Sequence, residues 1–375
     1  MGEPDFPPPA AVLAAATRAL SDGETKYTAV TGTVSLRNAI ADDLQKRKGV
    51  TYDAGTEIVV GNGAKQCVFQ GLLATCGTGD SVVIPSPYWP SYPEMATLAG
   101  AEPIILETKR EDGYLIDPSA LRSCLKANPN AKMLILCNPS NPTGGVHDAK
   151  RLKDLALVLE EFPNVFVLAD EIYERLVYVD DDEGDKTSAL EGERHTSFAS
   201  ISSAMRDRTL TINGFSKAYA MTGFRLGYVA APIRIAKAIT TIQSQLTSCA
   251  GSISQAAGVA ALRDVTEEEM ESNVVAMKGK RDYVLGRLEQ MSGVTVAVPP
   301  NGAFYVLPDV SQFFEGDDTD LCLRLLTDKG LALVPGSSFG APGTVRISYA
   351  TSLAELGVAM NKLQEFLNEN LPSSS

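Results

Sequence analysis

Short runs of apolar residues recur through the first two-thirds of the chain, and longer amphipathic stretches separate them. Within each run the apolar residues follow one another instead of alternating with polar ones, which is typical of strands buried on both faces. The runs span residues 57–60, 81–84, 102–106, 133–137, 165–169, 209–212 and 227–230. Because helical stretches lie between them, they predict an α/β fold with a mostly parallel, seven-stranded sheet between helices.

The C-terminal third has a different pattern. A charged helical stretch at residues 266–291 ends before Gly293 and would lead into a smaller α+β unit, with strands at 295–298, 303–307 and 345–348. The 375 residues are too many for one small core. We therefore expect an N-terminal segment at residues 1–12 that associates with the small domain, a large domain at 13–285 and a small C-terminal domain at 286–375.

Charge, cysteine and histidine content argue against several functions. The formal net charge of −13 and the pI of about 4.8 disfavour nucleic acid or an anionic membrane as a partner, since both need a basic face. The six cysteines include no Cys-x-x-Cys pair and there are two histidines, so no zinc-ligand set can be assembled and no metal is expected. The acidic run at residues 180–185 lacks calcium-loop spacing and predicts a solvated loop.

The expected location follows from what the sequence contains. No apolar run approaches the roughly 18 residues of a membrane-spanning helix. The acidic, proline-rich start is neither a signal nor a transit peptide, and scattered cysteines suit a reducing compartment. We expect a cytoplasmic protein, with an organelle such as a plastid as the alternative, and a disordered tail at residues 372–375.

One lysine follows a predicted strand in a setting that favours chemistry. The strand at 209–212 ends in an Asn-Gly turn that leads to Lys217, and Arg225 follows eight residues later. A lysine in apolar surroundings has a lowered pKa, so its neutral amine can attack a carbonyl, and an arginine offers a planar fork for a phosphate. A carbonyl and a phosphate on one small molecule indicate pyridoxal phosphate. The alternative is a solvated lysine in a turn.

A glycine-rich turn also follows a predicted strand. The segment Gly61-Asn62-Gly63-Ala64-Lys65-Gln66 opens a helix expected at residues 66–76, and such a turn exposes backbone N–H groups to a phosphate. The alternative is a dinucleotide-binding fingerprint. Two features count against it, because Gln66 replaces the third glycine and Asp80 precedes its strand instead of ending it.

Together with these segments, three further motifs carry a family resemblance. They are Asn138-Pro139-Ser140-Asn141-Pro142-Thr143-Gly144-Gly145, Asp170-Glu171-Ile172-Tyr173 and Arg346-Ile347-Ser348-Tyr349-Ala350. In this order and spacing the chain resembles class I pyridoxal-phosphate-dependent aminotransferases of fold type I, especially bacterial and plastid-type aspartate/prephenate aminotransferases. The resemblance runs from Gly2 to about residue 365. It implies pyridoxal 5′-phosphate as cofactor, residues 13–285 as the cofactor-binding domain, and a homodimer with shared active sites.

The resemblance assigns residues to the ring of the cofactor. Asp170 would pair with the pyridine nitrogen, Tyr173 and Asn141 with the ring 3′-oxygen, and Trp89 would stack on the ring. Tyr173 lies three residues after Asp170 and would share its helical face. Three of these residues have a structural alternative: Asp170 could cap a following helix, Asn141 could serve the turn before a proline, and Trp89 could fill the core.

Phosphate contacts are implied for a second set of residues. From this chain they are Gly63, Ala64, Lys65 and Arg225, and Tyr27 would reach the phosphate of the neighbouring subunit. Gly214 stands where many members have a hydroxyl residue, so one phosphate contact is expected to be absent.

The substrate would meet Gly2, Lys65, Trp89, Asn141 and Arg346. Arg346 lies in a buried-looking strand, so a carboxylate partner is expected; the resemblance makes it the substrate α-carboxylate, and a structural salt bridge is the alternative. Lys65 would bind the distal carboxylate, or else point into solvent at the start of a helix or steady the phosphate.

These assignments predict amino-group transfer between aspartate and 2-oxoglutarate, with Lys217 as the catalytic lysine. Prephenate or an aromatic oxo acid is the alternative substrate. Family members carry some tens of residues before the segment that begins at Gly2, so we expect that an N-terminal segment is lacking from this sequence. A weakly active or non-catalytic relative is the other functional alternative.

Overall fold

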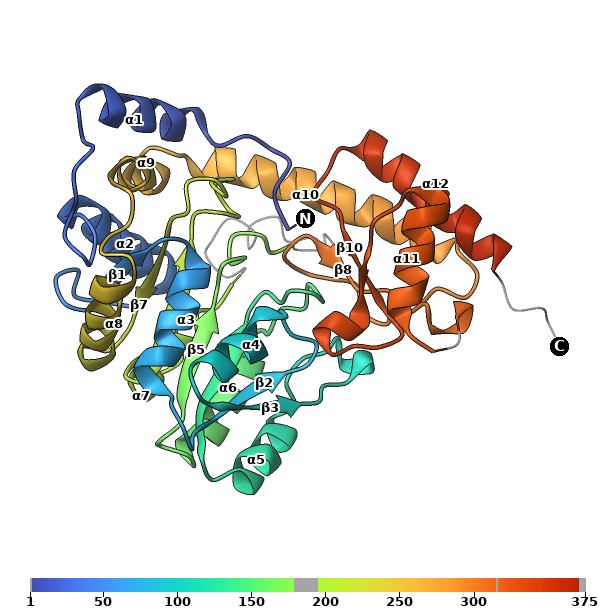
Figure 1. Ribbon diagram of the computed structural model, residues 1–375, viewed down its shortest axis with the longest axis horizontal. Coiled ribbons are helices and arrows are strands. Elements are labelled where there is room, and N and C mark those ends of the chain that lie inside the picture. Colours follow the sequence, from blue (N-terminus) through green and yellow to red (C-terminus); the bar gives the residue numbers. More distant parts are fainter. Residues whose placement is uncertain (1, 179–194, 315, 371–375) are drawn as a thin grey trace.

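The computed structural model describes residues 2–178, 195–314 and 316–370, so the acidic run at 180–185 and the tail at 372–375 lie outside the described residues. A seven-stranded sheet has the order β1-β7-β6-β5-β4-β2-β3. Its strands are β1 (Ile58–Gly61), β2 (Ser81–Pro85), β3 (Glu102–Leu106), β4 (Ala131–Cys137), β5 (Phe166–Asp170), β6 (Thr209–Gly214) and β7 (Gly227–Ala230). Each predicted run thus forms a strand, and the predicted α/β fold is confirmed (Figure 1).

The sheet is mostly parallel because only β7 runs against its neighbours. It pairs antiparallel with β1 and β6, whereas β2–β3, β2–β4, β4–β5 and β5–β6 are parallel pairs. No helix separates β6 from β7, so the chain returns through the loop at residues 215–226, which carries Lys217 and Arg225. The carboxyl ends of the six parallel strands lie at one edge of the sheet, where ligands bind in open α/β folds.

Helices cover both faces of this sheet. They are α2 (Val34–Lys48), α3 (Ala64–Thr75), α4 (Ser91–Leu98), α5 (Pro118–Ala127), α6 (Ala149–Glu160), α7 (Ser203–Arg206), α8 (Ile233–Leu246) and α9 (Ser252–Arg263). Helix α1 (Ala10–Ser21) packs on α9. In β4, Met133 and Ile135 pack with α3, α4 and α8, whereas Leu134 and Leu136 pack with α5 and α6. Helices α2 and α9 cover β1 and β7 on that second face. Burial on both faces explains why the strands read as unbroken apolar runs.

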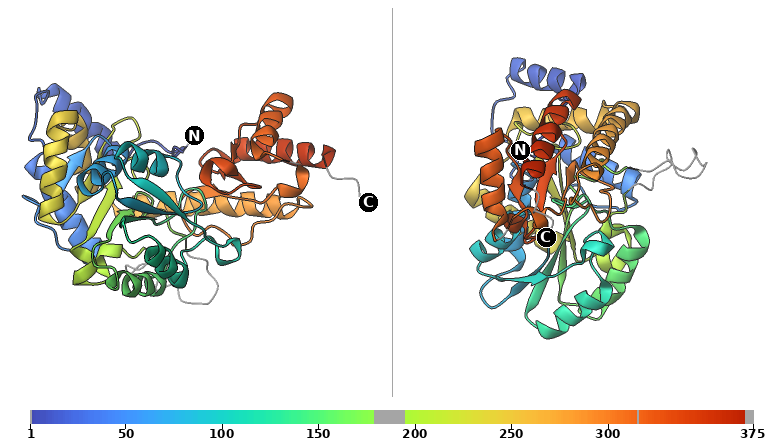
Figure 2. Two further views of the ribbon diagram at one scale, coloured as in Figure 1. Left: turned by 60° about the horizontal axis from the view of Figure 1, so that its bottom comes forward. Right: turned by 90° about the vertical axis from the view of Figure 1, so that its right-hand side faces the viewer.

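A long helix, α10 (Glu267–Glu289), connects the two parts of the molecule, close to the predicted 266–291 (Figure 2). Its N-cap Thr266 accepts a hydrogen bond from the backbone N–H of Glu269. The first turn is acidic, and its negative charges stabilise the helix by interacting with the positive end of the helix dipole. The boundary expected at residues 285/286 falls within this helix, and the division into domains stays a prediction. No helix in the described ranges is long and apolar enough to cross a membrane.

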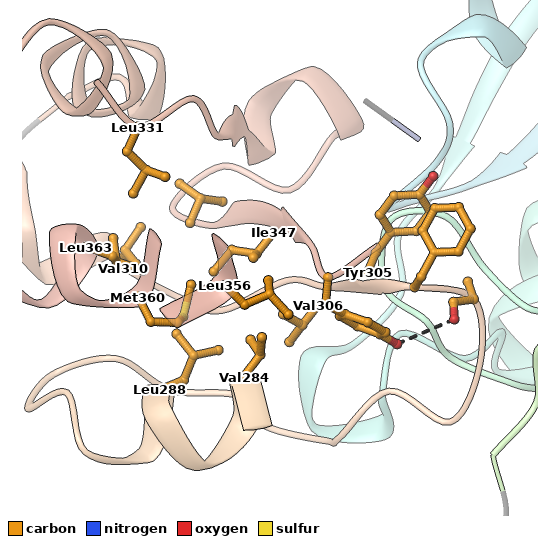
Figure 3. Close-up of a cluster of buried hydrophobic side chains, with 14 of the residues drawn as sticks. Val284, Leu288, Tyr305, Val306, Val310, Leu331, Ile347, Leu356, Met360 and Leu363 are labelled. Atoms are coloured by element: carbon orange, nitrogen blue, oxygen red, sulfur yellow. Dashed lines mark hydrogen bonds between the residues drawn. The ribbon is translucent and has the colours of Figure 1, made fainter. Parts of the chain in front are cut away.

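The C-terminal unit contains a small antiparallel sheet, β8-β10-β9, with β8 (Tyr305–Val306), β9 (Val334–Pro335) and β10 (Val345–Ser348). Helices α11 (Asp318–Lys329) and α12 (Leu353–Glu369) pack on it with α10. Figure 3 shows apolar side chains of α10 and α12 meeting those of the small sheet. At 303–307 the predicted strand is reduced to β8.

The strand predicted at 295–298 is wrong. Within that segment Thr295 makes one isolated bridge with Asp309. Residues 297–299 are exposed, and the prolines at 299 and 300 have no N–H to donate to a ladder.

Candidate active site

A cavity of about 440 Å³ lies at the edge where the parallel strands end, beside the C-terminal unit. Ten of the twelve predicted site residues line it: Gly2, Ala64, Lys65, Trp89, Asn141, Asp170, Tyr173, Lys217, Arg225 and Arg346. Of the other two, Gly63 lies directly against the Arg225 guanidinium, and Tyr27 is 90% exposed away from the cavity. Segments that are far apart in sequence thus converge on one small-molecule site.

Lys217 is held in a largely apolar part of the cavity. Its Nζ lies 5.9 Å from the ring centre of Tyr173 and 5.7 Å from that of Phe304, and it donates a hydrogen bond to the carbonyl of Gly2. Burial lowers the pKa of Lys217 to about 8, with Glu3 opposing the shift. A substantial fraction of the amine is therefore neutral, and nucleophilic, near physiological pH.

This lowered pKa predicts a pH dependence. Below about pH 8 the ammonium form of Lys217 dominates and cannot attack a carbonyl, so the rate at which Lys217 condenses with an added aldehyde should rise toward pH 8 and level off above it. Glu3→Gln removes a negative charge that raises the pKa of Lys217, so the midpoint of the pH–rate profile should lie at a lower pH in this variant. The rate can be followed by the absorbance of the product, with the same reaction of a free amine as the reference. A profile that stays flat between pH 7 and 9 contradicts the assignment.

The start of α3 and Arg225 form a cradle for an anion. Gly63 has φ +88°, and a Cβ there would lie 2.4 Å from Nη2 of Arg225, so glycine allows the guanidinium to cross this turn. A Cβ at Gly227 would lie 2.4 Å from the backbone nitrogen of Ala64, so glycine also lets β7 approach the helix. Arg225, at φ +50°, hydrogen-bonds the carbonyl of Thr222 and makes no ion pair with any described residue. The guanidinium and the helix N-terminus can therefore bind a phosphate.

Asp170 is the last residue of β5 and is buried. Its Oδ2 accepts a hydrogen bond of 2.7 Å from the Tyr92 hydroxyl, and its Oδ1 accepts one of 3.3 Å from the backbone N–H of Ile172. Burial raises the pKa of Asp170 to about 6, a shift that the bond from Tyr92 opposes. A buried carboxylate of this kind gains stability when a cationic group binds beside it.

The segment after Asp170 is not a helix, which corrects two expectations. Residues 172–175 form a turn, and the backbone of residues 176–178 then pairs with 301–303, as in the bond from Ala303 N–H to the Leu176 carbonyl. Because this pairing engages groups that a helix would use, Asp170 caps no helix. Tyr173 likewise reaches the cavity from a turn and not from a shared helical face.

Trp89 and Lys65 form one wall of the cavity. Trp89 is half-buried, meets Tyr92 edge-on with ring centres 5.2 Å apart, and lies 4.8 Å from Nζ of Lys65. The tryptophan packs with the core on the sheet, as the core-filling alternative expects, and it also lines the cavity. Its stacking on a cofactor ring stays a prediction. Lys65 is exposed at the start of α3, beside the anion cradle.

Among the residues that the structure describes, no carboxylate pairs with Arg346. Its Nη1 donates to Oδ1 of Asn141 at 3.1 Å, and its buried Nε has no partner. The rings of Tyr305 and Phe339 lie 4.5 Å and 4.8 Å from the guanidinium carbon. It makes no ion pair in the described part of the chain, so among these residues the structural salt bridge is not found and the guanidinium is available for an anion.

Sequence reasoning missed other residues of the cavity: Glu3, Tyr92, Cys137, Ile172, Ser216, Thr222 and Tyr305. Thr222 and Ser216 belong to the loop of Lys217 and could have been included by proximity. For Tyr92 and Tyr305 the only signal was aromatic character near a strand end. Their partners, Asp170 and Tyr173, lie far away in sequence.

A group of potential metal ligands lies outside the cavity. Glu171, Glu174 and His195 have ligand atoms within 4.8 Å of one another, the one such group found among the residues that the structure describes. Nζ of Lys48 lies 2.5 Å from both carboxylates. Arg47 lies 2.7 Å from Glu174, so the lysine and this arginine together balance the two carboxylates, and the cluster is a buried ion-pair network.

The fold and this site are those of an α/β protein with a buried reactive lysine beside an anion cradle, and the similarity to known proteins identifies its family. Residues 1–363 match the family "Aminotransferase class I and II", whose members use pyridoxal phosphate. The chain belongs to this family and is an aminotransferase.

Its relatives include aspartate and prephenate aminotransferases. The chain is 44% identical to "Aspartate aminotransferase" of Pinus pinaster, covering 98% of this chain and 73% of that protein. It is 40% identical to "Aspartate/prephenate aminotransferase" of Cereibacter sphaeroides, covering 97% and 89%. Among solved structures, the aspartate aminotransferase of Thermus thermophilus with maleate matches with TM-score 0.88 and 37% identity, covering 98% of this chain and 90% of that one.

Proposed function

We propose that this aminotransferase binds pyridoxal 5′-phosphate in the cavity and moves an amino group from aspartate to 2-oxoglutarate. The observation that carries the proposal is that three groups, each suited to a different part of the cofactor, lie together. A lysine with a lowered pKa, a buried carboxylate and an anion cradle line the same 440 Å³ cavity. These groups fit the aldehyde, the pyridine nitrogen and the phosphate of the cofactor.

Each of these groups has a distinct task. Bound pyridoxal phosphate supplies an electron sink for the pair released when the substrate Cα–H bond breaks. Asp170 holds a proton on the pyridine nitrogen, because a buried carboxylate favours a cation beside it. Lys217 attaches the cofactor and, once freed, carries the proton away from the substrate Cα. Tyr173 and Asn141 donate hydrogen bonds to the ring oxygen.

The substrate carboxylates are bound by two cations from different parts of the chain. Arg346 binds the α-carboxylate through the guanidinium that no described residue neutralises, with Asn141 beside it. Lys65 binds the distal carboxylate from the wall that it forms with Trp89. The similar aminotransferase of Thermus thermophilus was solved with maleate, a dicarboxylate, which supports a dicarboxylic substrate here.

Prephenate or an aromatic oxo acid is the second candidate. The supporting observations are the aspartate/prephenate aminotransferase of Cereibacter sphaeroides and a structure of an aromatic aminotransferase from Pyrococcus horikoshii at 35% identity and TM-score 0.89, covering 98% of this chain and 95% of that one. A homodimer with shared active sites completes the proposal. The 90% exposure of Tyr27 leaves it free to reach the phosphate bound by a second subunit.

Substitution of Lys65 tests the dicarboxylic preference. Lys65→Met keeps the alkyl chain over Trp89 and removes the charge, so KM for aspartate should rise roughly ten- to a hundredfold more than KM for an aromatic amino acid. That range corresponds to one charge-assisted contact of about 1.5–3 kcal/mol. Lys65→Arg keeps a cation and serves as the matched control. An equal loss for both donors would show that Lys65 serves the cofactor or the fold.

A further inference from the structure

Two aromatic rings lie close to the guanidinium of Arg346. The guanidinium carbon lies 4.5 Å from the ring centre of Tyr305 and 4.8 Å from that of Phe339. Tyr305 lies in β8, next to β10, which carries Arg346, and both rings are about 1% exposed. An arginine has several rotatable bonds, and stacking on rings restricts them without neutralising the charge. The guanidinium thus keeps its orientation, with a hydrogen bond to Asn141 and no ion pair to any described residue.

The hydroxyl of Tyr305 has a separate partner. It lies 2.9 Å from the hydroxyl of Tyr173, which reaches the cavity from the turn after β5. Burial raises the pKa of both tyrosines, so both hydroxyls are protonated and one donates to the other. Figure 3 shows Tyr305 at the end of the C-terminal core nearest the ribbon of the large sheet unit. One side chain therefore touches the arginine of β10 and the tyrosine beside Asp170.

We propose that Tyr305 is a positioning residue with two separable actions. Its ring holds the Arg346 guanidinium ready for the substrate α-carboxylate, and its hydroxyl fixes the Tyr173 hydroxyl toward the cofactor ring oxygen. The inference rests on the proposed function and deepens it, because it assigns the positioning of the substrate-binding arginine and that of the cofactor-binding hydroxyl to different parts of one side chain. Phe339 shares the first action and lacks a hydroxyl for the second.

Three variants separate the two actions. Tyr305→Phe removes the hydroxyl and keeps the ring, Tyr305→Leu removes both, and Phe339→Leu removes the other ring. Two readouts are needed on protein loaded with pyridoxal phosphate: the dissociation constant of maleate, and the pH midpoint of the visible absorbance band without inhibitor. Circular dichroism reports whether each variant is folded.

Tyr305→Phe should bind maleate within about twofold of the parent chain and shift the band midpoint by at least about 0.5 pH unit. Phe339→Leu should weaken maleate about tenfold and leave the midpoint in place. Tyr305→Leu should show both effects, and the first two variants decide the matter if it does not fold.

Two results overturn the inference. If Tyr305→Phe weakens maleate about tenfold, the hydroxyl and not the ring serves the carboxylate site. If neither Tyr305→Phe nor Phe339→Leu moves its own readout, Tyr305 only fills the core. If the parent chain binds no cofactor and has no visible band, the proposed function itself fails.

Discussion

Lys217→Ala is expected to abolish turnover, with kcat at least about 10⁴-fold lower and the fold intact. The variant loses the amine that attaches the cofactor and, with it, the group that carries the substrate proton. The side chain is largely buried and its charge is disfavoured by burial, so its loss should change Tm by only a few degrees. Steady-state kinetics and a thermal melt measure the two effects.

Lys237→Ala is the matched control for Lys217→Ala, because Lys237 is an exposed lysine of α8 outside the cavity. It should leave kcat unchanged. Activity in Lys217→Ala above about one-hundredth of the parent value would contradict the catalytic assignment, since general acid–base catalysis alone contributes about 10²–10⁴-fold.

Asp170→Asn is expected to lower kcat at least about a hundredfold, close to 2.7 kcal/mol of transition-state stabilisation. The amide keeps the shape and the hydrogen-bond capacity toward Tyr92 but cannot hold a proton on the pyridine nitrogen by charge. Cofactor affinity should fall less than kcat, because the anion cradle at α3 and Arg225 is untouched. Titration of cofactor-free protein and single-turnover kinetics measure these quantities separately.

Tyr92→Phe is the partner control for Asp170→Asn. It removes the hydroxyl that bonds Oδ2 of Asp170 and leaves the carboxylate, so its effect on kcat should be the smaller of the two. If Asp170→Asn reduces kcat by less than about tenfold, the carboxylate does not sustain the electron sink.

Features that depend on neighbouring residues in sequence could be predicted. The run at 209–212 and the turn after it predict a strand that ends just before Lys217, since burial on both faces leaves a continuous apolar pattern. The anion cradle at the glycine turn before α3 is also predictable from the sequence, because a helix N-terminus needs only local backbone geometry to bind an anion.

Features that depend on tertiary pairing could not be predicted. The turn after Asp170 was expected to be a helix, but the backbone beyond it pairs with residues 301–303, more than a hundred positions away. The hydroxyl pair of Tyr173 and Tyr305 spans 132 positions. For Arg346 the sequence predicts an anionic partner but cannot say whether the chain supplies it. In the structure aromatic rings surround the guanidinium, and its Nε has no partner among the described residues.

The central claim is that Lys217 attaches pyridoxal phosphate in this cavity, and chemical trapping tests it most directly. The protein is loaded with the cofactor, reduced with borohydride so that the bond to the lysine becomes permanent, digested and mapped by mass spectrometry. We predict one labelled peptide, modified at Lys217, and no label on the exposed Lys65 that lines the same cavity. Label on any other lysine, or none on Lys217 in protein that carries the cofactor, would contradict the claim.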